Sequence, residues 1–179
     1  MFLCYTDKDI VGYYFRLAAV MAGRPVFFYH QRGLHMRGLQ IVIIDGQGGR
    51  MGKGIVEQLK KRFPELPLTA VGTNSIATAA MLKAGADWGA TGENPVIVNS
   101  RSADIIIGPV GIVIADSLLG EVTEAMAAAV GKSSAHKLLI PVSHRCSHTI
   151  LGCGELPLSD YIRIACDEVE KRLEENSIS

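Results

Sequence analysis

A strongly apolar run that ends in an acid and a cluster of glycines constrains the fold of this chain most. Residues 41–44 are Ile-Val-Ile-Ile, and they lead into Asp45 and then into Gly-Gln-Gly-Gly-Arg-Met-Gly at residues 46–52. Four β-branched residues in succession predict a strand that is buried on both faces. Glycines between such a strand and a helix favour a tight turn whose backbone can approach an anion. Residues 41–52 therefore predict a strand–turn–helix unit that holds a phosphate group.

Apolar runs and helical segments alternate after residue 36, a pattern typical of βαβ units. The predicted strands cover residues 39–45, 67–72, 86–90, 103–108 and 137–142, with a sixth at residues 149–153. The predicted helices cover residues 49–63, 75–84, 94–99, 110–130 with a break near Gly120, and 157–174. The fold class is α/β, and we expect a Rossmann-like three-layer sandwich. Its sheet would be mostly parallel, with five to six strands in the order 3-2-1-4-5 around the first strand.

Residues at the helix ends agree with these boundaries. Asn94 and Pro95 predict an N-cap followed by proline at the first helical position. Thr123 predicts an N-cap after the break near Gly120. Gly85 predicts the end of the helix at residues 75–84.

Composition limits the classes of partner. The chain has 179 residues, 48% of them hydrophobic, and a net charge of zero. This balance is typical of a compact globular protein and lacks the basic excess that nucleic-acid binding usually needs. Four cysteines in a chain of this size do not suggest a disulfide scaffold, so we expect a reducing, cytoplasmic location.

The first 35 residues form an atypical N-terminal extension. Residues 10–29 are apolar, but Arg16, Arg24 and Pro25 argue against a membrane span, and we expect no membrane partner. We interpret residues 1–35 as lying upstream of a true start at Met36, with a peripheral helix or partner-binding arm as the alternative. Residues 36–175 are then a single Rossmann-like nucleotide-binding domain.

The glycine-rich loop resembles the NAD(P)-binding loop of dihydrodipicolinate reductases. Its spacing is G-x-G-G-x-x-G, and Met51 stands where a strict G-x-G-x-x-G pattern has its third glycine. The resemblance implies that the loop holds the pyrophosphate of NAD(P)H and that Arg50 approaches the adenosine end. The reductases' His-rich segment is not found, so their reaction is not implied. The loop residues expected at the cofactor are Gly46, Gln47, Gly48, Gly49, Arg50, Met51 and Gly52. A tight turn without a ligand is the alternative.

A wider resemblance covers about residues 39–173. The chain is similar to a family of short bacterial Rossmann-like proteins of unknown function, which implies a fold but no activity. The matching phrases are Gly-Thr-Asn-Ser-Ile-Ala-Thr at 72–78, Ala-Gly-Ala-Asp at 84–87, Gly-Ala-Thr-Gly-Glu-Asn at 89–94 and Gly-Pro-Val-Gly-Ile-Val-Ile-Ala-Asp-Ser at 108–117.

Two other loops are expected beside the glycines. Dinucleotide sites usually have an acid at the end of the second strand, whereas this chain has Thr73 and Asn74. The missing carboxylate weakens NAD and leaves NADP or a mononucleotide open, with helix capping as the alternative role. Gly108 and Pro109, after the fourth strand, are expected near the nicotinamide-side ribose.

Catalytic and metal-binding candidates are few. Glu93 could act as a general base or favour a helix dipole. Asp116 lies in an apolar run, where a buried carboxylate needs a partner. Weak metal candidates are His144, Cys146, His148 and Cys153, which could bind zinc if the backbone is extended. The alternatives are a loop at the ligand edge of the sheet, or surface and core residues without a metal.

Three hypotheses follow. The first is binding of a nucleotide, with NAD(P) leading, and catalysis is left open. The second is an enzyme acting on a small phosphorylated metabolite, with the phosphate at residues 73–75. The third is a non-catalytic scaffold for assembly or regulation, which could form a homodimer through the alanine-rich residues 125–130.

Overall fold

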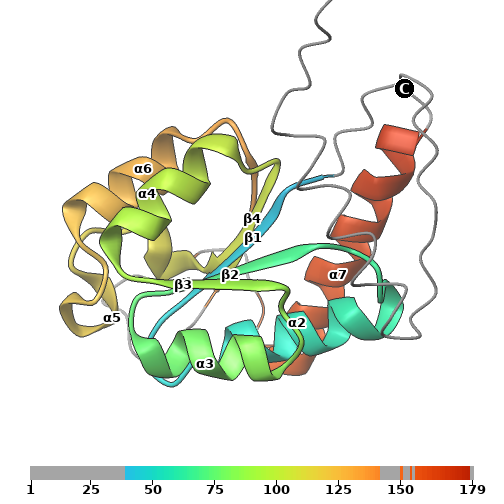
Figure 1. Ribbon diagram of the computed structural model, residues 1–179, viewed down its shortest axis with the longest axis horizontal. Coiled ribbons are helices and arrows are strands. Elements are labelled where there is room, and N and C mark those ends of the chain that lie inside the picture. Colours follow the sequence, from blue (N-terminus) through green and yellow to red (C-terminus); the bar gives the residue numbers. More distant parts are fainter. Residues whose placement is uncertain (1–38, 142–149, 151–153, 155, 178–179) are drawn as a thin grey trace, which may run out of the picture. The chain divides into compact units, whose positions relative to one another are not determined.

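The chain folds around a five-stranded sheet in which every strand is parallel to its neighbours (Figure 1). The computed structural model describes residues 39–141, 150, 154 and 156–177. The predicted order 3-2-1-4-5 is confirmed. The strands are β1 (Ile41–Asp45), β2 (Leu68–Gly72), β3 (Trp88–Thr91), β4 (Ile105–Pro109) and β5 (His136–Ile140).

The central strands are apolar because both of their faces are covered. Every residue of β1 and β4 is buried. Continuous Ile and Val runs are typical of parallel strands that lie between two helix layers. At the edge of the sheet β3 is short, and its Trp88 is exposed.

Helices cover both faces of the sheet, so the three-layer α/β sandwich is confirmed. One layer contains α2 (Arg50–Arg62), α3 (Ser75–Lys83) and α7 (Leu158–Ser177). The other contains α4 (Glu93–Ser102) and α6 (Glu124–Lys132) (Figure 1). Alternation along β1 places Ile41 and Ile43 in the core cluster of the first layer, and Val42 and Ile44 in that of the second.

Of the three predicted helix ends, two are present and one is wrong. Gly85, with a φ of 111°, lies just past the end of α3, as predicted. The Thr123 hydroxyl accepts a hydrogen bond from the Met126 N–H at the start of α6, as predicted. Helix α4, however, begins at Glu93 rather than after Asn94, and it continues to Ser102. Gly92 is its N-cap with a φ of 103°, which other residues rarely adopt, and this moves the helix start forward.

The long helix predicted for residues 110–130 is divided. The segment contains a 3₁₀ turn, η1 (Val110–Val113), a single short turn, α5 (Ser117–Gly120), and then α6. Asp116, Leu118 and Leu119 have left-handed φ values of 60°, 54° and 62°, which a continuous right-handed helix cannot contain. The break near Gly120 is confirmed, but it extends over most of the segment before Thr123.

Some predictions fall outside the described residues. These are the N-terminal extension at residues 1–35 and, apart from Ile150, the sixth strand at residues 149–153. Within the described ranges, no helix has the length and hydropathy that crossing a bilayer requires.

Candidate functional site

The predicted ligand-binding loops gather at the carboxyl edge of the sheet. The glycine-rich loop follows β1, which lies between β2 and β4. Helix α2 after β1 and helix α6 after β4 lie on opposite faces of the sheet (Figure 1). This is the reversal beside which ligands bind in open α/β sheets. The Thr73 N–H donates to the Asp45 carbonyl over 2.9 Å, which brings the loop after β2 against the loop after β1.

Close packing explains the first and third glycines of the loop. A Cβ atom on Gly46 would lie 2.7 Å from Thr73 Oγ1. A Cβ atom on Gly49 would lie 2.6 Å from the Cα atom of Ala77, and Gly49 also has a φ of 66°. A side chain at Gly49 would collide with the backbone of α3, whereas one at Gly46 would need the neighbouring side chains to shift.

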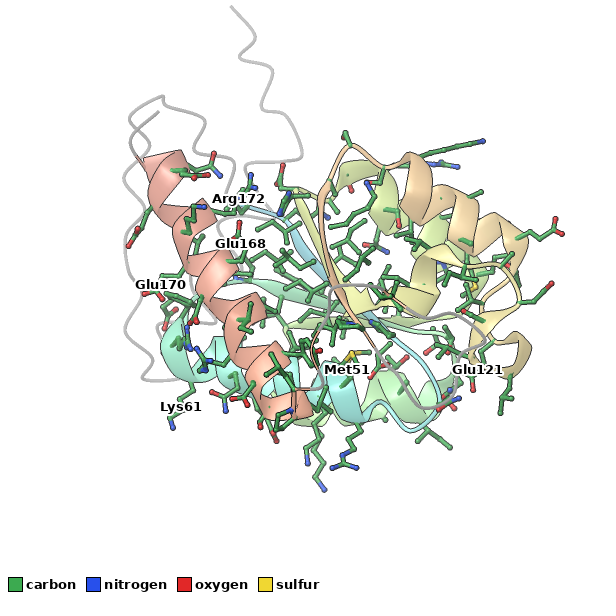
Figure 2. The ribbon with its side chains drawn as sticks, turned by 180° about the vertical axis from the view of Figure 1, so that it is seen from behind. Met51, Lys61, Glu121, Glu168, Glu170 and Arg172 are labelled. Carbon is green, nitrogen blue, oxygen red and sulfur yellow. The ribbon has the colours of Figure 1, made fainter. Side chains whose placement is uncertain are left out.

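The fourth glycine allows α2 to approach β1 and α3. A Cβ atom on Gly52 would lie 2.9 Å from the Asp45 Cβ atom and 2.4 Å from Met81 Sδ. Gly52 therefore has the packing role of the third glycine in the strict pattern, one residue later. Met51 is 8% exposed and belongs to the core under α2 (Figure 2), so its side chain is a packing group.

Gly48 differs from the other three glycines. It is exposed, and a Cβ atom built on it would meet no atom within 4 Å. Its φ lies outside the left-handed region, so its backbone conformation does not require glycine. Neither packing nor backbone strain explains this glycine.

A buried carboxyl group faces the loop and the start of α2 from the core. Asp45 is 5% exposed, its Oδ1 accepts from the Gly46 N–H over 2.8 Å, and its Oδ2 accepts from the Gly52 N–H over 2.6 Å. Burial raises the pKa of Asp45, although these N–H groups offset part of the shift. Asp45 thus uses N–H groups that an external anion would otherwise meet.

The glycine-rich loop also contacts an acid that the sequence did not predict, Glu121. Its Oε2 atom accepts hydrogen bonds from the Gln47 N–H over 2.8 Å and from Asn74 Nδ2 over 2.9 Å, and a third from the Thr73 hydroxyl. Burial opposes ionisation of Glu121, but the three hydrogen bonds outweigh it and hold its pKa below the usual value. An ionised carboxylate, that of Glu121, therefore lies against the glycine-rich loop and the end of β2 (Figure 2).

Asn74 has the capping role that was the alternative to ligand binding. Its Oδ1 accepts from the Ala77 N–H over 2.9 Å and caps α3. Its Nδ2 donates to the Gln47 carbonyl over 2.9 Å as well as to Glu121. Thr73 is directed at Glu121, so both polar side chains at the end of β2 are engaged by protein groups.

The two catalytic candidates lie on the surface. Glu93 is exposed, and its Oε2 accepts from the Thr123 hydroxyl over 2.5 Å, which joins the starts of α4 and α6. Asp116 is also exposed, so the expectation of a buried carboxylate there is wrong. Its apolar neighbours in the sequence lie in a turn of left-handed residues, not in a buried helix.

Gly108 and Pro109 are both buried at the end of β4. A Cβ atom on Gly108 would lie 2.3 Å from the Ile44 carbonyl oxygen, so close strand packing alone requires this glycine. Arg50 is exposed at the first position of α2.

The predicted metal candidates His144, Cys146, His148 and Cys153 lie outside the described residues. Among the residues that are described, no three His, Cys, Asp or Glu side chains cluster in a way that could hold a metal ion. Cys166 is a buried free thiol in the core, and burial raises its pKa to about 11.

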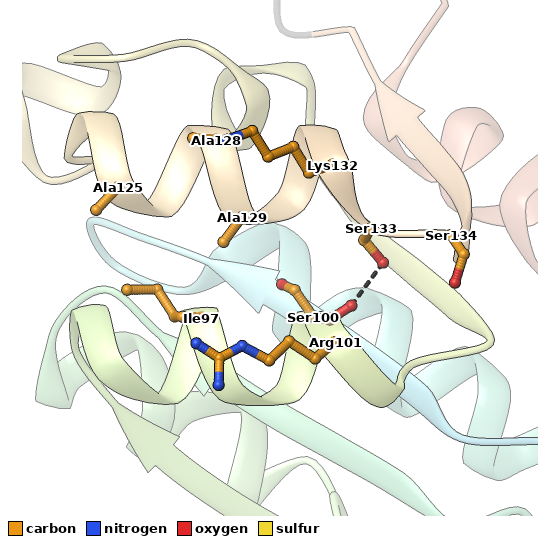
Figure 3. Close-up of a pocket in the computed structure, with 9 residues that line it drawn as sticks. All are labelled: Ile97, Ser100, Arg101, Ala125, Ala128, Ala129, Lys132, Ser133 and Ser134. Carbon is orange, nitrogen blue, oxygen red and sulfur yellow. Dashed lines mark hydrogen bonds between the residues drawn. The ribbon is translucent and has the colours of Figure 1, made fainter.

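A groove of about 530 Å³ lies away from the loop, between α4 and α6 (Figure 3). Ile97 and three alanines of α6, Ala125, Ala128 and Ala129, line it. Ser133 donates to the Ser100 carbonyl over 2.5 Å at one end. Arg101 and Lys132 lie in the last turns of the two helices, where cations balance the helix dipoles. Self-association through the exposed alanines of residues 125–130 stays a prediction.

Comparison with known proteins gives a family but no activity. No curated protein and no solved structure matched the chain significantly. The model of one protein family matches residues 40–174, which include every described strand and the whole carboxyl edge. The chain therefore belongs to the family described as a domain of unknown function, DUF3842.

Proposed function

We propose that this protein binds a nucleotide on the carboxyl edge of its sheet, with NAD(P) as the leading ligand. Gly48 carries the proposal. Close packing accounts for Gly46, Gly49 and Gly52, but the fold gives no reason for a glycine at the exposed position 48. In dinucleotide-binding loops the second glycine lets the backbone approach the pyrophosphate, and Gly48 is that second glycine.

The surroundings of Gly48 support an anionic ligand on one side of the loop. Arg50 lies exposed two residues further on, at the start of α2, where the helix dipole also favours an anion. Asp45 and Glu121 occupy the N–H groups of Gly52 and Gln47. We therefore expect a phosphate to bind the loop at residues 48–50, because the N–H groups on either side of this segment already donate to Glu121 and Asp45.

A small phosphorylated metabolite is the second candidate ligand. The Glu121 carboxylate bridges the glycine-rich loop and the end of β2, because it accepts hydrogen bonds from both Gln47 and Thr73. A dinucleotide extends across this region, whereas a small metabolite with its phosphate at residues 73–75 would occupy only the end of β2. Glu93 would lie at the same edge as a general base.

Calorimetric titration with NAD, NADP, ATP, GTP and inorganic pyrophosphate tests the proposal. We expect at least one nucleotide to bind, and we expect Gly48→Asp to weaken its affinity by about tenfold or more through steric and charge repulsion. Gly131→Asp is the matched control, because Gly131 is exposed, has open space at its Cβ position and lies in α6. It makes the same charge change away from the loop.

The outcomes separate the candidates. Binding of nucleotides that is lost in Gly48→Asp and kept in Gly131→Asp supports nucleotide binding. Binding of pyrophosphate alone favours the smaller ligand. Equal affinities in the two variants would remove Gly48 from the site and contradict the proposal.

A further inference from the structure

The loop that carries Glu121 crosses the candidate site. Residues 114–122, here called the crossing loop, connect η1 to the start of α6. Its Leu118 Cδ1 atom would lie 2.9 Å from a Cβ atom on Gly46, and Glu121 Oε2 would lie 2.8 Å from the same point. The crossing loop thus begins after β4, covers the end of β1 and reaches Thr73 beyond β2.

The base of the crossing loop is closed on itself. The Asp116 N–H donates to the Val122 carbonyl over 2.8 Å, and the Ser117 hydroxyl donates to the Gly111 carbonyl over 2.5 Å. These bonds join residues that are near one another in the sequence. They fix the two ends of the loop but do not hold its tip over the site.

The tip has a conformation that its own residues disfavour. Leu118 and Leu119 have left-handed φ values, and Leu119 is 92% exposed, so burial does not compensate for its backbone. Strained backbone persists only where surrounding contacts hold it in place. The tip is held across the site by the Leu118 side chain, which packs against the core, and by the Glu121 hydrogen bonds to Gln47, Thr73 and Asn74.

Carboxylate and phosphate oxygens accept from the same kinds of donor. Glu121 accepts from a backbone N–H of the glycine-rich loop and from two side chains at the end of β2. These are groups that a nucleotide phosphate or ribose would otherwise use. A phosphate has more acceptor oxygens and more charge than a carboxylate, so it can replace Glu121 on these donors.

We propose that Glu121 is an internal competitor for the ligand: its carboxylate holds the crossing loop closed over the glycine-rich loop, and a phosphate group displaces it. This rests on the proposed phosphate-bearing ligand, and it adds a closed state from which the ligand must release the crossing loop. Opening relaxes the left-handed residues and exposes the Gln47 N–H. The same carboxylate disfavours binding of anions while the loop is closed.

Hydrogen exchange and affinity of Glu121→Gln test the inference separately. Without ligand, we expect amides of residues 115–122 to exchange about tenfold faster than in the wild type, because the charged acceptor is lost. We expect pyrophosphate and NADP to bind about tenfold more tightly for the same reason. Glu124→Gln is the control: the substitution removes the same charge, and Glu124 is exposed in the first turn of α6. Both measurements are repeated on Glu121→Ala, which has no side-chain oxygen to accept these hydrogen bonds.

Unchanged exchange in both Glu121 variants would overturn the inference, because Glu121 would then not hold the loop. Weaker or equal ligand affinity in these variants would also overturn it, because Glu121 would then contact the ligand or be irrelevant to it. Faster exchange without binding of any phosphate compound would refute the nucleotide proposal and leave the closing role of Glu121 intact.

Discussion

The backbone N–H of Gln47 donates to the Glu121 carboxylate over 2.8 Å, although the two residues are 74 positions apart in the chain. This bond places a carboxylate against the glycine-rich loop, whose sequence predicts that it binds an anion. The end of β2 lacks the carboxylate that dinucleotide sites usually have, and Glu121 brings a carboxylate to that region from the opposite side of β1. The candidate site therefore combines a phosphate-binding loop with an internal anion.

The neighbouring glycines of the loop should differ sharply in their tolerance of a methyl group. Gly49→Ala places a Cβ atom 2.6 Å from the Ala77 backbone at a φ of 66°. We expect it to lower the free energy of unfolding by about 2–4 kcal/mol, from overpacking and left-handed strain together. Gly48→Ala meets open space and should change it by less than about 0.5 kcal/mol. Urea denaturation of both variants measures the difference, and similar costs would contradict the assigned loop geometry.

Gly131 offers a stabilising substitution away from the site. It is exposed in α6, and a Cβ atom there would meet nothing within 4 Å. Gly131→Ala should therefore raise the free energy of unfolding by about 0.5–1 kcal/mol, because glycine costs conformational entropy in a helix. Thermal and urea unfolding test this, and a destabilised variant would show that the position is not helical or not open.

Asp45→Asn should be costly although it removes a buried charge. The carboxyl group accepts from Gly46 on one oxygen and from Gly52 on the other, and an amide offers only one oxygen. One buried N–H would then face an NH₂ group, at a cost of about 1–3 kcal/mol in unfolding free energy. Asp160→Asn is a control, since its side chain is 43% exposed and its ion pair with Arg163 spans 3.9 Å. Equal effects of the two changes would show that Asp45 does not organise the loop.

Acid should affect the two carboxyl groups at the site in opposite directions. The pKa of Glu121 is lowered from 4.5 on folding, so its contribution to stability is present above 4.5 and is lost as the pH falls through the folded-state pKa. The deficit of Glu121→Gln relative to the wild type should then shrink below pH 4.5. The pKa of Asp45 is raised from 3.8 on folding, so its contribution is complete below 3.8 and is lost as the pH rises through the folded-state pKa.

The deficit of Asp45→Asn should therefore grow as the pH falls toward 3.8, whereas the deficit of Glu121→Gln should shrink as the pH falls below 4.5. Urea titrations at a series of pH values give both curves. Parallel curves for the two variants would contradict the environments assigned to these carboxyl groups.

The sheet could be predicted because its signals are local. The Ile and Val run of β1 and the turn residues after it specify a buried parallel strand and a helix start within a few positions. The start of α4 was missed because the φ of Gly92 outweighed the capping preference of Asn94.

Glu121 could not be predicted because its role depends on contacts across the sheet. Leu118 and Leu119 are residues that favour helix, so their left-handed φ values have no signal in their side chains. Nothing local indicates that this acid meets Thr73, which lies 48 positions earlier. The glycine motif was predictable as a motif, but only the three-dimensional packing separates Gly48 from the glycines that the fold requires.

An NMR titration of the ¹⁵N-labelled protein with NADP, up to about 1 mM, tests the central claim most directly. Nucleotide binding at the loop predicts saturable shifts of the Gln47, Gly48 and Arg50 amides, with larger shifts at the same total ligand in Glu121→Gln before saturation. The Gly131 amide, in α6, should stay unshifted. No saturable shift at Gly48 in either protein, or shifts confined to other parts of the chain, would contradict the claim that this loop holds the ligand.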